Sequence, residues 1–352
     1  MIAGFTLGAS ITPAEWGLAS RPKNQTPAKR AHSHHIKPED ITMLRTFPTP
    51  ISRLASAVRH LLLPAVVLAA AACDNPTEPI RANPRPSLAL TAPTGKGQIL
   101  FTSGSFDSQQ FVVDPVTMNV VQLTSGPDYH SVGAWSADYT KITFSKGLWG
   151  GLWTMDADGT NETQVLAMPQ EVRSSVFSPD GKYIAFIANV PDPQVHTVEL
   201  ATGVIKQLTN LTGLGLRISW SFDGKKLLFT KEKGGIGNLF TIAPDGTGLK
   251  QITKCVKVYC NDGQFSPDGT QIAFIYGGQV ATIMANGANM QLVTSAADPQ
   301  PHYPSWSPKG DRLAYERYAI NQHDIWIVDL GSGATTPVVT SRVDDTTPSW
   351  SR

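Results

Sequence analysis

A ten-residue pattern recurs along this chain and constrains its fold more than any other feature. It opens with an aromatic residue and Ser, passes through a turn rich in Pro, Asp and Gly, and closes on a second aromatic residue. Complete copies lie 41 to 45 residues apart and begin at Trp135, Phe177, Trp220, Phe265 and Trp306. A period of about 40 residues, built from short apolar runs and glycine-rich turns, is typical of β-propeller blades.

The two ends of the repeat region each carry half of the pattern. Residues 98–102 match its second half, while Trp350 and Ser351 match its first half. We therefore predict an all-β, six-bladed propeller of four-stranded blades over residues 98–352, closed by pairing of the C-terminal strand with the N-terminal segment. Such closure pairs the two terminal strands, which an open array would leave exposed. The six closing aromatic residues are Phe101, Phe144, Phe186, Phe229, Phe274 and Tyr315.

Each copy of the pattern predicts the same order of strands. The innermost strand is expected to end at the aromatic-Ser pair, and Ser-Pro-Asp-Gly is expected to form the turn into the second strand. Segments that end in Gln-Leu-Thr, such as residues 122–124, are expected to form the fourth strand. Four tryptophans share the first aromatic position, where a flat ring would fill the space between blades: Trp135, Trp220, Trp306 and Trp350.

The segment before the repeats has the features of an export signal. Residues 43–72 contain three arginines, followed by an uncharged run that ends in small residues before Cys73. This order is typical of a signal peptide, and the junction at Cys73 resembles a bacterial lipobox, in which the cysteine is acylated. The alternative is an ordinary cleaved signal with an incidental cysteine. Because an export signal works from the N-terminus, we expect translation to start at Met43 and residues 1–42 to be a non-native extension.

The composition of the chain predicts a tether before the propeller, a disulfide within it and the absence of a nucleic-acid partner. Residues 73–97 are rich in proline and predict an extended tether between the lipidated Cys73 and the propeller. In an exported protein, the close pair Cys255 and Cys260 is expected to form a disulfide that stabilises a loop between two blades. The formal net charge is +1 with 16% charged residues, which gives no basic surface for nucleic acid. We predict a monomer without a cofactor.

The recurring pattern resembles the repeats of the TolB β-propeller family. The Ser-Pro-Asp-Gly turns, the Trp-Thr-Met-Asp-Ala-Asp-Gly segment at 153–159 and the Gln-Leu-Thr strand ends carry the resemblance over residues 98–352. It implies a six-bladed propeller in the bacterial cell envelope that binds protein partners. A full TolB has a small α/β domain before its propeller and is soluble in the periplasm. Here residues 43–97 predict a signal, a lipid site and a tether, so the resemblance implies a TolB-like propeller lipoprotein.

The loops before the innermost strands are expected to share one rim of the central channel. Loops between the second and third strands, for example 231–237 and 316–323, join the same face and add polar and aromatic side chains suited to recognition. The alternative interpretation is that exposed loops are polar in any protein. We predict a non-catalytic role in which this rim binds an envelope protein or a peptidoglycan-associated partner. The candidate residues are Asp128, Tyr129, His130, Glu171, Arg173, Arg217, Tyr259, Asp262, His302, Tyr303, Arg342 and Asp345.

Two other functions are considered for the same rim. A metal-dependent lyase or hydrolase would use His130 and His302 with Asp128 or Asp262, but two histidines without a matching third ligand are weak evidence. A prolyl oligopeptidase-type enzyme is set aside because the chain has no Gly-x-Ser-x-Gly motif. A carbohydrate-binding module would need aromatic platforms, and the candidates are Tyr129, Trp149 and Tyr303.

Overall fold

The computed structural model describes residues 96–105, 107–147, 150–168, 171–189, 192–298 and 300–351. The predicted extension, signal, lipid site at Cys73 and nearly all of the tether lie outside the described residues, as does Trp149. The described part is all-β, with 24 strands and no helix. No described segment therefore has the length and apolarity of a membrane-crossing helix.

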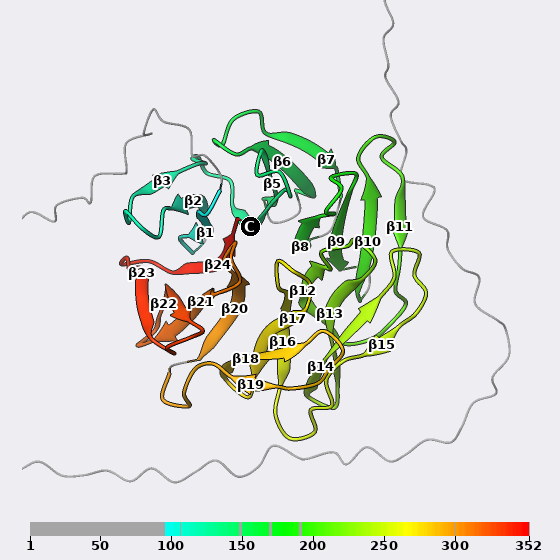
Figure 1. Ribbon diagram of the computed structural model, residues 1–352. Helices are drawn as coiled ribbons and strands as arrows, with labels where there is room; N and C mark the ends of the chain where they lie inside the picture. The colour runs from blue at the N-terminus through cyan, green and yellow to red at the C-terminus, as the bar shows by residue number, and fades with distance from the viewer. Residues whose placement is uncertain are drawn as a thin grey trace, which may run out of the picture. The chain divides into compact units, whose positions relative to one another are not determined.

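The strands form six four-stranded sheets arranged as blades around a central axis (Figure 1). The first blade has the order β24 (Asp345–Trp350), β1 (Ile99–Ser103), β2 (Gln109–Val113) and β3 (Val120–Gln122). The second blade contains β4 (His130–Trp135), β5 (Lys141–Lys146), β6 (Leu152–Asp156) and β7 (Thr163–Leu166). The third contains β8 (Val172–Phe177), β9 (Tyr183–Asn189), β10 (Pro193–Glu199) and β11 (Ile205–Gln207).

The remaining three blades continue in chain order from the inner to the outer strand. The fourth contains β12 (Leu214–Trp220), β13 (Leu227–Lys233), β14 (Ile236–Ile242) and β15 (Lys250–Gln251). The fifth contains β16 (Cys260–Phe265), β17 (Gln271–Tyr276), β18 (Gln279–Met284) and β19 (Gln291–Leu292). The sixth contains β20 (Pro301–Trp306), β21 (Arg312–Ala319), β22 (Gln322–Asp329) and β23 (Thr335–Val339).

The last strand closes the ring, as the split pattern predicted. β24 pairs antiparallel with β1, with Ile99 opposite Trp350 and Ser103 opposite Asp345. Beyond the paired residues, the Ser351 amide donates to the Gln98 carbonyl at 2.9 Å. In Figure 1 the red β24 lies beside the cyan β1, so the two ends of the described chain complete one blade. The predicted six-bladed closure is confirmed.

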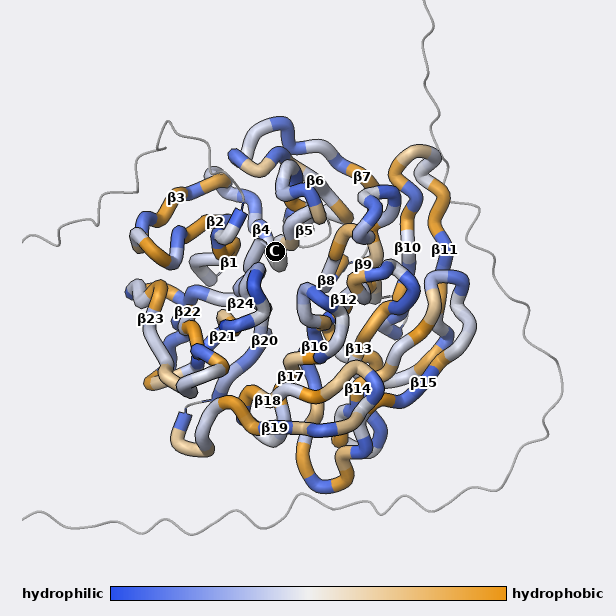
Figure 2. Tube along the Cα trace, viewed as in Figure 1, coloured by the Kyte–Doolittle hydropathy of each residue, from blue (hydrophilic) through white to orange (hydrophobic). Residues whose placement is uncertain are grey.

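The hydrophobic core consists of six clusters, each between two neighbouring blades. Successive residues of a strand point to opposite faces of a sheet. Leu227 and Phe229 of β13 therefore pack against the third blade, while Leu228 packs against the fifth. Hydrophobic segments recur in every blade (Figure 2). Because every blade packs on two neighbours, each copy of the repeat needs its own apolar runs.

The Ser-Pro-Asp-Gly segments and their variants form the expected turns after the first aromatic residue of every complete copy. In the third blade, Ser178 Oγ donates to Asp180 Oδ1 at 2.6 Å, and the Lys182 amide donates to the same oxygen at 3.1 Å. Gly181 adopts a φ of 70°, a conformation that glycine takes without steric cost. We call the side of the ring that carries these turns the turn face, and the opposite side, with the loops before the innermost strands, the rim face.

The shared tryptophans pack between blades and also join them by hydrogen bonds. Trp135, Trp220 and Trp306 are 8%, 6% and 1% exposed, which agrees with the expected packing role. Their indole Nε1 groups donate to a carbonyl of the neighbouring innermost strand: that of Ser349 at 3.1 Å, Val176 at 3.3 Å and Gln264 at 3.1 Å. The sequence pattern did not predict these bonds.

Two of the expected rim loops are shorter than predicted. β13 and β14 pair as far as Lys233 and Ile236, and β21 and β22 pair as far as Ala319 and Gln322. Each hairpin turns through two residues with positive φ, which is the geometry of two-residue hairpin turns. Most of the segments 231–237 and 316–323 is therefore strand rather than loop.

Candidate binding site in the propeller channel

The structure places the predicted rim residues at three levels of exposure. Asp128, Tyr259 and Arg342 are exposed at the rim face. Six residues are half-buried at the starts of the innermost strands or just before them: Tyr129, Glu171, Arg173, Arg217, His302 and Tyr303. The remaining three, His130, Asp262 and Asp345, are buried.

The expectation of an exposed side chain is corrected for His130 and Asp345, which are 1% and 0% exposed. Both occupy the position five residues before the first aromatic residue, where Cys260 and Pro301 are also buried. This position points between blades, so its side chain packs inside whatever its polarity. The His130 ring lies 5.4 Å from the Phe144 ring, and its Nε2 lies 3.4 Å from Glu162 Oε1. Burial lowers the pKa of His130, and the Glu162 charge opposes this shift.

Charged side chains on the rim face are largely paired with one another. Lys146 Nζ lies 2.5 Å from Glu162 Oε2 and 3.6 Å from Asp128 Oδ2. In the next blade, Arg173 Nη2 lies 2.8 Å from Glu171 Oε2. These pairs orient the charged groups that the rim offers to a partner.

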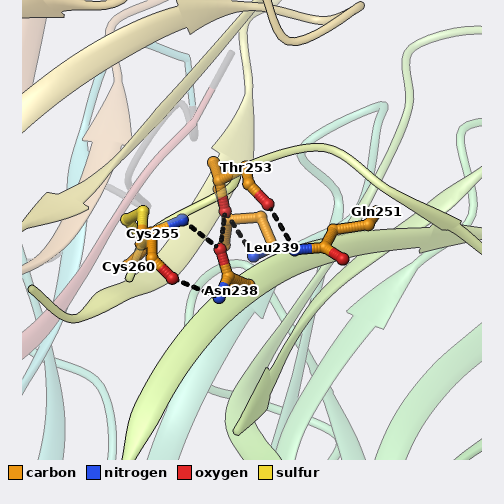
Figure 3. Close-up of a disulfide and its surroundings, with 6 residues drawn as sticks. All are labelled: Asn238, Leu239, Gln251, Thr253, Cys255 and Cys260. Carbon is orange, nitrogen blue, oxygen red and sulfur yellow. Dashed lines mark hydrogen bonds between the residues drawn. A yellow bond between two sulfur atoms is a disulfide. The ribbon is translucent and has the colours of Figure 1, made fainter. Parts of the chain in front are cut away.

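The predicted disulfide between Cys255 and Cys260 is present in the loop between the fourth and fifth blades (Figure 3). Asn238 holds this loop from both sides: its Nδ2 donates to the Cys255 carbonyl at 3.1 Å, and its Oδ1 accepts from the Cys255 amide at 2.7 Å. The Tyr259 hydroxyl, also in this loop, donates to Glu232 Oε2. The disulfide and Asn238 together fix the loop that presents Tyr259, and no sequence pattern indicates the role of Asn238.

A single repeat position supplies the side chains that meet inside the channel. The residue three before the first aromatic is Arg217, Asp262, Tyr303 and Thr347 in the fourth, fifth, sixth and first blades. Asp262, Tyr303 and Thr347 have φ values of 55°, 53° and 53°, next to irregularities in the pairing of the innermost strand. Non-glycine residues in this conformation are strained, and such strain clusters at binding and catalytic sites.

These channel residues form a compact electrostatic cluster. The Arg217 guanidinium lies over the Tyr303 ring at 4.6 Å from its centroid. Asp262 Oδ2 accepts from Asn261 Nδ2 at 3.2 Å and lies 3.9 Å from His302 Nδ1. The hydrogen bond with Asp262 raises the pKa of His302, while burial, followed by the Asp262 charge, raises the pKa of Tyr303. Burial lowers the pKa of Arg217, and the Asp262 charge acts in the opposite direction.

A cavity of about 590 Å³ occupies the channel between this cluster and the turn face. Arg217 and Asp262 lie at its inner end, and Trp135, Trp220 and Trp350 contribute to its wall. Its volume falls within the range of about 300–1,000 Å³ that is usual for small-molecule sites. We call the apolar residues where it reaches the turns the mouth residues: Ala137, Pro179, Phe222, Pro267 and Pro308. The sequence pattern indicates the rim face but carries no signal for this cavity.

The described geometry bears on the alternative functions through the residues that each of them would use. Within the described ranges, no group of three or more His, Cys, Asp or Glu side chains is placed to hold a metal ion. His302 does lie beside Asp262, but His130 is buried against Glu162. Of the proposed sugar platforms, Tyr303 is covered by Arg217, and Trp149 lies outside the described residues.

The fold defines the class of the protein as a six-bladed β-propeller, with a cavity along its channel. Residues 150–352, more than half of the chain, match the TolB beta propeller domain. The chain belongs to this family.

Individual relatives agree with this assignment. A Tol-Pal system protein TolB from Francisella tularensis subsp. mediasiatica is 24% identical over 228 residues, covering 58% of this chain and 50% of that protein. The chain thus spans about half the length of the curated relatives it matches. The crystal structure of TolB from Acinetobacter baumannii has a TM-score of 0.64 at 20% identity, covering 74% of this chain and 67% of that one.

An enzyme shares the fold as well. An oligogalacturonate lyase in complex with manganese has a TM-score of 0.53 at 18% identity, covering 71% of this chain and 76% of that one. At this identity the likeness shows the propeller fold alone, because unrelated functions are built on the same fold.

Proposed function

We propose that this protein is a lipid-anchored propeller of the bacterial cell envelope that binds a protein or peptidoglycan-associated partner through its rim face. The observation that carries the proposal is the set of aromatic and charged side chains that several blades present around the channel at this face. Membership of the TolB propeller family supports it, since the curated relatives are named as proteins of the Tol-Pal system. Acylation of Cys73 would hold the propeller at a membrane surface.

The disulfide loop is the part of the rim best suited to a partner. Tyr259 is 37% exposed, and Val256 in the same loop is 75% exposed. Because the disulfide and Asn238 already fix this loop, little conformational entropy would be lost when a partner binds. Aromatic side chains on rigid supports are the residues most often found at the energetic centre of protein interfaces.

The test is a crosslinking pull-down of the full-length protein from its own envelope, followed by mass spectrometry. A variant with Tyr259→Ala and Arg342→Glu changes the rim face, whereas the control Lys225→Glu reverses one exposed charge on the turn face. We expect a partner that the wild type and the control both capture and that the rim variant loses. Capture of the same proteins by all three would contradict binding at the rim face.

The lipid anchor has its own test. Cys73→Ser removes the thiol that would be acylated, so we expect the variant to lose incorporation of labelled fatty acid and to appear in the soluble fraction. The control is the wild-type protein processed in parallel, and an antibody against the propeller measures each protein in the membrane and soluble fractions. Continued membrane retention of the variant would contradict lipid anchoring and leave rim binding unaffected.

A further inference from the structure

Arg217 is the charged side chain of the channel whose hydrogen-bonding capacity is least used. Its Nη2 is buried and has no hydrogen-bond partner among the described residues. Its identified neighbours are the Tyr303 ring, on which it stacks, and the charges of Asp262 and Glu316, with neither of which it forms an ion pair. Both Glu316 oxygens already have partners, in His323 Nδ1 at 2.6 Å and the Thr347 amide at 3.0 Å. Buried donors without acceptors are uncommon, and a missing ligand is one explanation.

The position of Arg217 in the cavity indicates what kind of ligand would supply the acceptor. Arg217 lies at the inner end, whereas the mouth residues at the other end are apolar. Phe222 at the mouth is 61% exposed, so its ring is open to contact with an apolar ligand. The cavity is therefore polar at depth, where Arg217 and Asp262 bring opposite charges, and apolar at its entrance.

We propose that this cavity binds a carboxylate carried on an apolar body, with Arg217 as the contact for the carboxylate and the mouth residues around the body. A carboxylate presents two oxygens in a plane, which matches the donor geometry of a guanidinium. The same chemistry is found in a small organic acid and in the C-terminus of a peptide. The site goes beyond the proposed function, because it is reached from the turn face and does not use the rim.

Asp262 sets the strength of this site. Its carboxylate lies at the same end of the cavity as Arg217 and would repel an incoming carboxylate. Its Oδ2 is engaged by Asn261 and faces His302, so part of its charge is offset from the rim side. Asp262→Asn keeps the shape of the side chain and suits the positive φ of 55°, since Asn tolerates this conformation well. This variant should therefore fold and should bind a carboxylate more tightly.

The experiment measures binding of matched acids and amides to the full chain by isothermal titration calorimetry. The small-molecule probes are hydrocinnamate and hydrocinnamide, and the peptide probes are acetyl-Leu-Phe with a free or an amidated C-terminus. We expect each acid that binds to do so at least about tenfold more tightly than its amide, and Arg217→Gln to remove that difference. Asp262→Asn should tighten acid binding by about threefold. Lys206→Gln, which removes one exposed positive charge from the outer strand β11, should change nothing.

Which pair binds identifies the source of the carboxylate, and either result supports the proposal. Equal binding of acid and amide by the wild type would overturn it, as would the absence of binding by all four probes. If Arg217→Gln fails to fold, the acid–amide comparison and the Asp262→Asn variant still decide. Weaker acid binding by Asp262→Asn would also overturn the assignment of Arg217 as the carboxylate contact. None of these outcomes depends on the rim variants, so the proposal and the proposed function fail separately.

Discussion

Individual side chains in this propeller are governed by their place in the repeat rather than by their chemistry. The position three before the first aromatic brings Arg217, Asp262 and Tyr303 together in the channel from three successive blades. The position five before it is buried in the second, third, fifth, sixth and first blades, although its residues range from Val172 to Asp345. A charged residue five positions before the first aromatic is therefore desolvated between two blades, and this desolvation lowers the stability of the fold.

Asp345 makes this cost measurable through the pH dependence of stability. Burial raises the pKa of Asp345 to about 6, and hydrogen bonds from Ser103 and Ser341 oppose the shift. An unfolded aspartate has a pKa near about 3.9, so the folded state binds the proton more tightly and loses stability as the pH rises from about 4 to 6. Asp345→Asn removes the charge, and we expect it to raise the free energy of unfolding at pH 7 by on the order of 2 kcal/mol.

The measurement is denaturant unfolding of both proteins between about pH 4 and 8, with the stability difference expected to shrink toward the acidic end. Asp245→Asn is the control of opposite sign. Hydrogen bonds from Thr247 lower the pKa of Asp245, so its charged form favours the folded state and its replacement should destabilise at neutral pH. A pH-independent difference for Asp345→Asn would show that its charge is not the cause.

At the scale of the blade, neighbouring sheets are joined by packing and by the indole hydrogen bonds of the shared tryptophans. The second and sixth blades have Trp135 and Trp306 at this position, whereas the third and fifth blades have Phe177 and Phe265. Phe is therefore compatible with the position, and what Trp adds is a larger ring and one bond to the next blade. The apolar pattern predicts the packing but carries no information about that bond.

Trp306→Phe tests the contribution of the bond. The change removes the donor to the Gln264 carbonyl, and we expect a loss of about 1 kcal/mol from the hydrogen bond in addition to lost packing. Trp326→Phe is the matched control, because the Trp326 Nε1 is buried without a hydrogen-bond partner among the described residues. Denaturant unfolding should show a larger loss for Trp306→Phe. A larger loss for Trp326→Phe would show that ring packing outweighs the indole bond.

At the scale of the whole molecule, the sequence was sufficient to predict the ring and insufficient to predict its channel. Blade number, strand order and closure follow from the spacing of the pattern, because each copy forms one sheet that packs only on its neighbours. The disulfide followed from the proximity of Cys255 and Cys260. The cluster around Arg217 did not, since it depends on how far side chains of different blades extend across the axis. The burial of His130 is not evident from the sequence, because a polar residue near a strand end is usually exposed.

Closure of the ring is the property on which the stability of the whole propeller should depend. Deleting residues 346–352 removes most of β24, leaves β1 without its inner partner and exposes the cluster in which Trp350 is 3% exposed. Loss of a buried tryptophan alone costs about 3–5 kcal/mol, a large part of the roughly 5–15 kcal/mol that stabilises a typical domain. We expect a strongly lowered melting temperature that involves all six blades, because every blade supports its neighbours. Trp350→Phe, which retains the strand, should cost much less. An unchanged melting temperature after the deletion would contradict the role of β24 in holding the ring closed.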